Sequence, residues 1–168
     1  MLASRGAAVS AALSKPELVR ELRATLASAL DTARRAHAAA LEGATHSESR
    51  AENDKDTRGL EQSYLARGQA QRVADLEAAV AELGIFAPRA FAEGAVIALG
   101  ALITADEDGE ARRLFVAPHG GGSVVAGDVH VVTPASPLGK ALLGKRAGDE
   151  VEVKLPGRTR TLAIAEVR

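Results

Sequence analysis

Residues 43–57 read Gly-Ala-Thr-His-Ser-Glu-Ser-Arg-Ala-Glu-Asn-Asp-Lys-Asp-Thr and separate two long segments rich in Ala, Leu, Glu and Arg. A polar run between two helical segments of similar length is typical of the tip of an antiparallel helical hairpin. Connections of this length are uncommon in compact domains unless they are functional or disordered. We therefore predict a helical hairpin over residues 1–84, with an acidic tip near residues 43–57.

The segment before the tip has the start signals of a helix. Ser14 is suited to cap the free N–H groups, Pro16 is tolerated in a first turn, and Glu17 favours the positive end of the helix dipole. We expect this helix to reach Leu41 and to end near Gly43. Its apolar seam follows the spacings of three and four that coiled coils use: Leu18, Leu22, Thr25, Ala29, Ala33, Ala36 and Ala40.

The segment after the tip predicts a second helix from about Thr57 to Leu83, with Gly84 as its stop. Gly68 indicates a close approach of the two backbones, because the opposing seam is mostly Ala. Alternatively, both helices extend several residues into the polar run and shorten the tip. The expected seam of the second helix comprises Leu60, Tyr64, Val73, Leu76, Val80 and Leu83.

The hydrophobic pattern changes after residue 84. Residues 85–91 are expected to be a linker, and the following alternation of apolar and polar residues predicts a sheet. One short helix is expected at 136–143, with Ser136 as its N-cap and Pro137 at its first position. The fold class is thus α+β, with a sheet domain over residues 92–168. Strands are expected at 95–105, 113–117, 129–132, 150–155 and 160–167, with a hairpin turn at 106–109.

Composition excludes several functions. The formal net charge is −1 and the sequence pI is about 6.4, which disfavours direct binding of duplex DNA. Cysteine is absent, which excludes disulfides and thiolate metal sites and fits a reducing cytoplasm. No apolar run approaches the roughly 20 residues needed to span a bilayer, so neither a membrane anchor nor a signal peptide is expected. We expect a cytoplasmic protein.

Residues 132–153 carry the most specific pattern of the chain, Val-Thr-Pro-Ala-Ser-Pro-Leu-Gly-Lys-Ala-Leu-Leu-Gly-Lys-Arg-Ala-Gly-Asp-Glu-Val-Glu-Val. The order of Ser-Pro, apolar helix, Gly-Lys, Gly-Asp, alternating strand, Pro-Gly and final strand resembles the C-terminal signature of the Gre transcript-cleavage factors of bacterial RNA polymerase. Leu-Gly-Ala-Leu-Ile at 99–103, followed by an acidic turn, is similar to the same domain.

The resemblance implies a C-terminal domain of FKBP-like fold that docks on the rim of the polymerase secondary channel. It implies that a coiled-coil hairpin enters the channel and presents acidic residues to a catalytic Mg²⁺, which activates water to cleave backtracked RNA. The protein would be a monomeric accessory factor without a stably bound cofactor, not an enzyme, contacting the 3′ end of the nascent RNA only indirectly. The implied partner contacts are Thr133, Pro134, Ser136, Pro137, Leu138, Lys140 and Lys145.

The candidate metal-presenting residues are the tip carboxylates Glu48, Glu52, Asp54 and Asp56. Glu48 and Glu52 are four apart, so on a helix they share one face and could reach one cation. The tip lacks the Asp-Leu-Ser-Glu-Asn run typical of the family, and Glu52-Asn53 is its closest counterpart. Alternatively, Arg50 and Lys55 neutralise these acids and the tip is a solvated loop.

Other functions remain as alternatives. A factor of this shape could bind the secondary channel without cleavage and inhibit or modulate the polymerase, or it could be a plain protein-interaction module. A prolyl isomerase is disfavoured, because its pocket is rich in aromatic residues and this domain offers only Phe91 and Phe115. Gly120-Gly121-Gly122 lacks the Lys-Ser/Thr of a P-loop, and a hairpin turn is expected there. The four histidines show no metal-ligand spacing.

Overall fold

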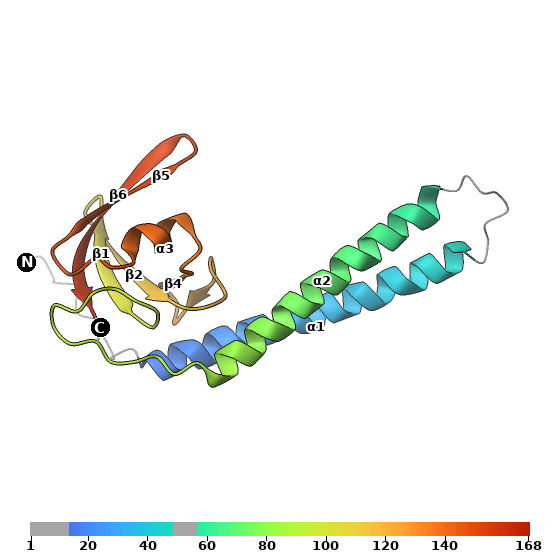
Figure 1. The fold of residues 1–168 in the computed structure, drawn as a ribbon, viewed down its shortest axis with the longest axis horizontal. Helices are drawn as coiled ribbons and strands as arrows, with labels where there is room; N and C mark the ends of the chain where they lie inside the picture. Colours follow the sequence, from blue (N-terminus) through green and yellow to red (C-terminus); the bar gives the residue numbers. More distant parts are fainter. Residues whose placement is uncertain (1–13, 49–56) are drawn as a thin grey trace, which may run out of the picture. The chain divides into compact units, whose positions relative to one another are not determined.

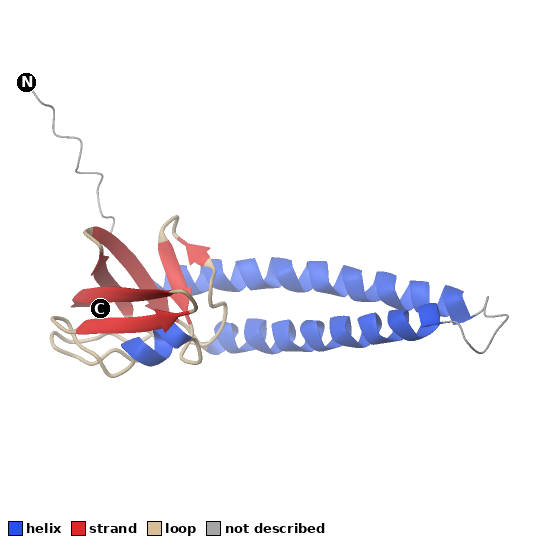
Figure 2. Ribbon diagram, turned by 90° about the horizontal axis from the view of Figure 1, so that it is seen from above, coloured by secondary structure: helices blue, strands red, loops and turns tan. Residues whose placement is uncertain are grey.

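A computed structural model describes residues 14–48 and 57–168 (Figures 1 and 2). Among these residues the contacts define two compact units. One unit contains residues 14–21, Ala87–Ala117 and Gly121–Arg168. The other contains Leu22–Phe86 and the short segment Pro118–Gly120.

The helical unit is built from α1 (Lys15–Glu48) and α2 (Thr57–Ile85), which lie side by side in both views (Figures 1 and 2). α1 begins next to Ser14 and α2 begins at Thr57, as the sequence predicts. The predicted stop of α1 is wrong, because α1 continues five residues past Gly43, whereas α2 ends at Ile85, one residue past Gly84. The alternative with longer helices is therefore correct for α1 and not for α2, which does not extend into the polar run. A glycine inside a helix costs only about 1 kcal/mol, which packing between two long helices can offset.

The seam between the helices differs in part from the predicted one. Leu22, Ala33 and Leu83 are buried as expected. Thr25 and Ala36 are exposed instead, and so are Leu60 and Tyr64, at 61% and 62% of their surface. Counting back from Leu83 in steps of three and four reaches Ala66, so Tyr64 falls on the outer side of α2. Buried or half-buried seam residues missed by the sequence analysis are Leu26, Leu30, His37, Ala66, Ala70 and Ala79.

Two glycines of α2 lie in different surroundings. A Cβ added at Gly68 would meet nothing within 4 Å, so the predicted close approach of the backbones at this residue is wrong. A Cβ at Gly84 would lie 3.3 Å from the guanidinium of Arg23 on α1. Farther along the hairpin, an exposed ion pair joins Nη2 of Arg34 to Oε1 of Glu77 at 2.6 Å. At these two places the contact between α1 and α2 is made by the side chain of an α1 arginine, Arg23 beside Gly84 and Arg34 with Glu77.

The other unit is a six-stranded sheet with one short helix, α3 (Pro137–Leu142). The strand order is β3-β4-β2-β1-β6-β5, and every neighbouring pair is antiparallel except β2 and β4. The last strand in the chain therefore lies between β1 and β5 (Figure 1). The strands are β1 (Leu102–Glu107), β2 (Glu110–Val116), β3 (Val124–Val125), β4 (Val129–Val132), β5 (Glu150–Leu155) and β6 (Arg158–Val167).

The first strand starts later than predicted. Residues 95–101 form turns and irregular chain, and β1 begins at Leu102. Gly100 has a φ of +88°, and a Cβ there would lie 3.2 Å from the Cα of Pro88. This left-handed backbone, which strongly favours glycine, prevents the strand from extending backward. The turn after β1 is confirmed at Asp108-Gly109, where both residues have positive φ, the requirement of a tight type I′ hairpin.

Both faces of the sheet carry buried residues, but the face of β5 and β6 away from the main core is exposed. On one face, Leu114, Val116, Val151, Val153 and the side chains around them pack with Leu142 of α3 into the main core. On the other face, Phe115 is fully buried opposite Leu102 and beside Val131. Leu18 and Val19 of the first turns of α1, which belong to this unit, are also buried. The Glu21 carboxylate accepts a 3.0 Å hydrogen bond from the N–H of Ala126.

The linker packs against this sheet unit through Phe91, which contacts the main core. Nζ of Lys15 lies 4.5 Å from the centre of the Phe91 ring and donates a 2.7 Å hydrogen bond to the carbonyl of Arg89. Burial lowers the pKa of Lys15, and the neighbouring charges of Arg168 and Arg89 lower it further.

Among the described helices, none combines the length and the apolarity that crossing a membrane requires.

Candidate functional site

The loop and helix that carry the C-terminal signature are held by local hydrogen bonds. The hydroxyl of Ser136 donates to the carbonyl of Thr133 at 2.8 Å and accepts from the N–H of Gly139 at 3.0 Å. Ser136 is thus the N-cap of α3, and Pro137 occupies its first turn, as predicted. This geometry accounts for Ser-Pro as a helix entry.

Gly139 is required by close packing. A Cβ at this position would lie 1.9 Å from the carbonyl oxygen of Thr133, so no larger residue fits. At the other end of α3, the N–H of Ile97 donates to the carbonyl of Lys145 at 2.7 Å, and the N–H of Gly144 donates to the carbonyl of Ile97 at 2.9 Å. Several residues of the signature therefore serve the local fold.

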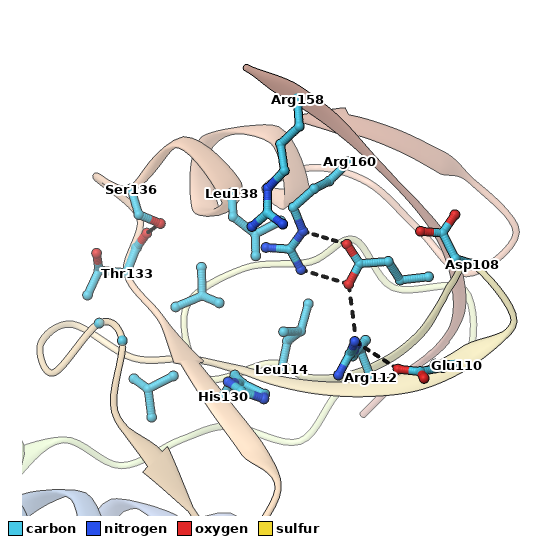
Figure 3. A pocket seen from close by; sticks show the side chains of 15 residues that line it. Asp108, Glu110, Arg112, Leu114, His130, Thr133, Ser136, Leu138, Arg158 and Arg160 are labelled. Atoms are coloured by element: carbon cyan, nitrogen blue, oxygen red, sulfur yellow. Dashed lines mark hydrogen bonds and ion pairs between the residues drawn. The ribbon is translucent and has the colours of Figure 1, made fainter. Parts of the chain in front are cut away.

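The side chains of the predicted partner contacts fall into two groups. Pro137, Lys140 and Lys145 are exposed. Thr133, Pro134, Ser136 and Leu138 are half-buried. Thr133, Ser136 and Leu138 also line a cavity of about 690 Å³ in the sheet unit (Figure 3). The structure thus brings three of the seven predicted residues to one concavity.

The floor of this cavity is a layer of charged side chains on three neighbouring strands. Alternate residues of a strand point to the same face, so charged residues that continue an apolar face lie beside the core. On each of these strands, the core-facing positions are apolar toward one end of the sheet and charged toward the other end. The series are Ile103, Ala105 and Glu107 on β1, Val116, Leu114 and Arg112 on β2, and Ile164, Leu162, Arg160 and Arg158 on β6.

Glu107 is the centre of this charged layer. Its carboxylate accepts hydrogen bonds from Nε and Nη2 of Arg160, at 2.5 Å and 2.8 Å. Nε of Arg112 lies 3.3 Å from the same carboxylate, and Nη2 of Arg112 lies 2.9 Å from Oε2 of Glu110. The hydrogen bonds from Arg160 hold the pKa of Glu107 below its ordinary value, against the opposing effect of burial. Glu107 in turn raises the pKa of Arg160.

The sequence analysis missed these charged residues. Their signal is present in the sequence, since Glu107, Arg112 and Arg160 each continue an alternating apolar series by one step. Arg158 continues the β6 series by a second step. A charged residue at a core-facing position is unusual unless it is paired or lines a site. The cavity therefore combines an apolar wall, hydroxyl groups and fixed charges.

The predicted tip carboxylates are mostly beyond the described part of the chain. Glu48 is the last residue of α1, and its side chain is not described. Glu52, Asp54 and Asp56 lie outside the described residues. Within residues 14–48 and 57–168, no group of three or more acidic or histidine side chains is placed to hold a metal ion.

Residues 93–168 match the family described as "Transcription elongation factor, GreA/GreB, C-term". A GreA of Rhodospirillum rubrum is 38% identical over 78 residues, covering 45% of this chain and 47% of the relative. A GreA of Nautilia profundicola is 33% identical over 109 residues, covering 63% of this chain and 62% of the relative. The chain thus spans about half to three fifths of the length of these curated relatives.

Solved structures similar to this chain include two Gfh1 proteins. The GreA factor homolog 1 (Gfh1) protein of Thermus thermophilus is 24% identical with a TM-score of 0.39, covering 87% of this chain and 94% of that one. Gfh1 of Thermus aquaticus is 25% identical with a TM-score of 0.40, covering 93% and 96%.

The chain thus contains two long helices followed by a sheet with one short helix. The sheet and the short helix lie within residues 93–168, the residues that match this family. The chain is GreA/GreB-like and is similar to GreA transcription elongation factors.

Proposed function

We propose that this protein is a transcription elongation factor that binds bacterial RNA polymerase at its secondary channel and stimulates cleavage of backtracked RNA. The observation that carries the proposal is a GreA/GreB C-terminal domain at residues 93–168, preceded in the same chain by the helical hairpin of α1 and α2. In this reading the protein is an accessory factor acting in the cytoplasm, and the polymerase performs the hydrolysis.

The C-terminal domain is the proposed docking part. Pro137, Lys140 and Lys145 are exposed on and after α3, where they are free to meet a partner surface. Thr133, Pro134, Ser136 and Leu138 support the same surface from half-buried positions. Ser136 and Gly139 fix the conformation of this loop, so the surface is formed before binding, which lowers the entropic cost of association.

The hairpin tip is the proposed metal-presenting part. Glu48, Glu52, Asp54 and Asp56 supply carboxylate oxygens, the donor type that Mg²⁺ prefers. A bound Mg²⁺ would lower the pKa of a coordinated water and stabilise charge on the phosphate undergoing hydrolysis. The contribution of this chain is to carry these carboxylates on the end of a paired helical support, with no direct contact to duplex DNA and with the RNA 3′ end met only through the metal.

A second candidate function is binding to the secondary channel without cleavage, which would inhibit or modulate the polymerase. It is favoured by one observation, the absence from residues 43–57 of the Asp-Leu-Ser-Glu-Asn run typical of cleavage factors. A plain protein-interaction module is the third.

A cleavage assay on stalled elongation complexes separates these candidates. The full chain is added to complexes with labelled nascent RNA, and shortened RNA is measured with and without Mg²⁺. We expect cleavage by the unmodified protein and its loss in at least one of Glu48→Ala, Glu52→Ala, Asp54→Ala and Asp56→Ala. Lys55→Ala, a change within the same run, is the control that should retain cleavage.

Each candidate gives a different result. Binding to core polymerase with slower transcript extension and no cleavage would establish the inhibitor. Absence of binding to core polymerase, under conditions where a GreA protein binds, would leave the interaction module.

A further inference from the structure

The cavity of the sheet unit contains one arginine whose charge is not used by the fold. Three arginines line it, and two of them are paired, Arg160 with Glu107 and Arg112 with Glu107 and Glu110. The side chain of Arg158, by contrast, makes no ion pair or hydrogen bond with any residue that the structure describes. It is exposed, and its side chain extends into the cavity from the same face of β6 as Arg160 (Figure 3).

We propose that this cavity binds an acidic side chain of a protein partner, with its carboxylate received by Arg158 and its neighbouring apolar residue placed against Leu138. The inference rests on the proposed function for the identity of that partner, bacterial RNA polymerase, but the cavity chemistry stands apart from it. A planar guanidinium receives a carboxylate through two parallel hydrogen bonds, which gives direction as well as affinity.

The charges around Arg158 favour a single carboxylate. Glu107 is committed to Arg160 and Arg112, so it does not neutralise Arg158. Glu110 and Asp108 also line the cavity and would repel a nucleic-acid backbone, which brings a charge with every phosphate. The lining contains no Phe, Tyr or Trp, and its one ring is the imidazole of His130, so it offers little surface on which bases could stack. A lone acidic side chain brings a single negative charge and therefore meets less of this repulsion.

The lining also suits the rest of a polypeptide segment. Leu114, Val132 and Leu138 provide an apolar wall, and Thr133 and Ser136 add hydroxyl groups. The cavity adjoins the loop that precedes α3, so a segment bound to that loop could place one side chain inside. Mixed apolar and charged contacts of this kind are typical of the anchor positions of protein interfaces.

The first test uses model ligands and does not involve the polymerase. The amide shifts of Thr133 and Gly139 are followed by NMR while N-acetyl-leucyl-glutamic acid amide is added to the full chain, with N-acetyl-leucyl-glutamine amide as the uncharged match. We expect saturable shifts with the glutamate ligand and none with the glutamine ligand. In Arg158→Ala the shifts with the glutamate ligand should be lost. Lys154→Ala should keep them, because Lys154 pairs with Thr159 and points to the opposite face of the sheet.

Equal shifts from both ligands, or unchanged shifts in Arg158→Ala, would overturn the proposal. A larger response to inorganic phosphate than to the glutamate ligand would also overturn it, in favour of a phosphate site.

The second test measures the affinity of the labelled full chain for core RNA polymerase by fluorescence anisotropy. Arg158→Ala should weaken binding about tenfold, the value of one charge-assisted contact, and Lys154→Ala should bind like the unmodified chain. Equal binding by the unmodified chain and Arg158→Ala refutes the cavity inference and leaves the proposed function intact. Absence of polymerase binding together with a positive NMR result refutes the proposed function and supports the cavity inference.

Discussion

Arg160 donates two hydrogen bonds to Glu107, from Nε at 2.5 Å and from Nη2 at 2.8 Å, across the neighbouring strands β1 and β6. The Glu107 side chain is only 11% exposed, so this pair is shielded from solvent far more than the ion pairs of the hairpin. Removing the Glu107 carboxylate would leave the charge of Arg160 beside the core without its ionic partner. The stability of the sheet unit should therefore depend on this pair and on pH.

Glu107→Gln should lower the free energy of unfolding by about 2 kcal/mol at pH 7, because Arg160 loses its ionic partner. The folded-state pKa of Glu107 is lowered from 4.5, so its stabilisation is present above that pH and is lost as pH falls through the lowered pKa. Urea unfolding at pH 7 and pH 3 measures the difference between variant and unmodified chain. That difference should shrink at pH 3, and an equal difference at both pH values would contradict the linkage. Glu110→Gln, whose side chain is 71% exposed, should change stability by less than about 0.5 kcal/mol.

Gly139→Ala should destabilise the sheet unit by about 3 kcal/mol or more, because its Cβ would stand 1.9 Å from the carbonyl oxygen of Thr133. Gly68→Ala is the matched control, since its Cβ would meet nothing within 4 Å on a helix. That change should stabilise the protein by about 0.5 to 1 kcal/mol. Thermal unfolding followed by circular dichroism checks both variants, and equal effects of the two substitutions would refute the steric argument.

Leu30→Ala should lower stability by about 2 to 3 kcal/mol, because Leu30 is buried between the helices at 7% exposure. Leu60→Ala removes the same atoms from a side chain that is 61% exposed, and it should be nearly neutral. Urea unfolding monitored by helix content distinguishes the two variants. A larger loss of stability in Leu60→Ala than in Leu30→Ala would instead support the seam predicted from the sequence, which includes Leu60 and not Leu30.

Arg34 and Glu77 should couple weakly, by about 0.5 kcal/mol in a double-mutant cycle at low salt. Their side chains are 57% and 49% exposed, so water screens the attraction. The cycle uses Arg34→Ala, Glu77→Ala and the double variant, each unfolded at 0.05 M and 1 M NaCl. We expect the coupling to approach zero at 1 M. A coupling above 2 kcal/mol would show that the pair holds the helices together.

The sequence predicts the elements of this protein better than their edges. Pro137 and Ser136 place α3 correctly, because capping is decided within a few residues. Gly43 fails as a helix stop, because packing between two helices outweighs the local preference of one glycine, whereas Gly84 lies one residue before the end of α2. Gly100 interrupts the expected long first strand through its left-handed backbone, with a φ of +88°, which the alternating pattern does not reveal.

The site shows the same division. The loop before α3 is visible in the sequence because Ser136, Pro137 and Gly139 each have a local role. The charged layer of Glu107, Arg112 and Arg160 arises from three strands placed side by side, and single-strand alternation gives only a hint of it. The tip carboxylates remain a prediction from the sequence, because Glu52, Asp54 and Asp56 lie outside the described residues.

The position of β6 between β1 and β5 has a consequence for synthesis on the ribosome. β1 emerges early and forms its hairpin with β2, but its other edge stays open until residues 158–167 leave the exit tunnel. The helical hairpin, made first from neighbouring segments, can pair during that interval. A pause in translation before residue 158 would therefore hold the chain with a folded hairpin and an incomplete sheet, which is the stage most exposed to aggregation and to proteases.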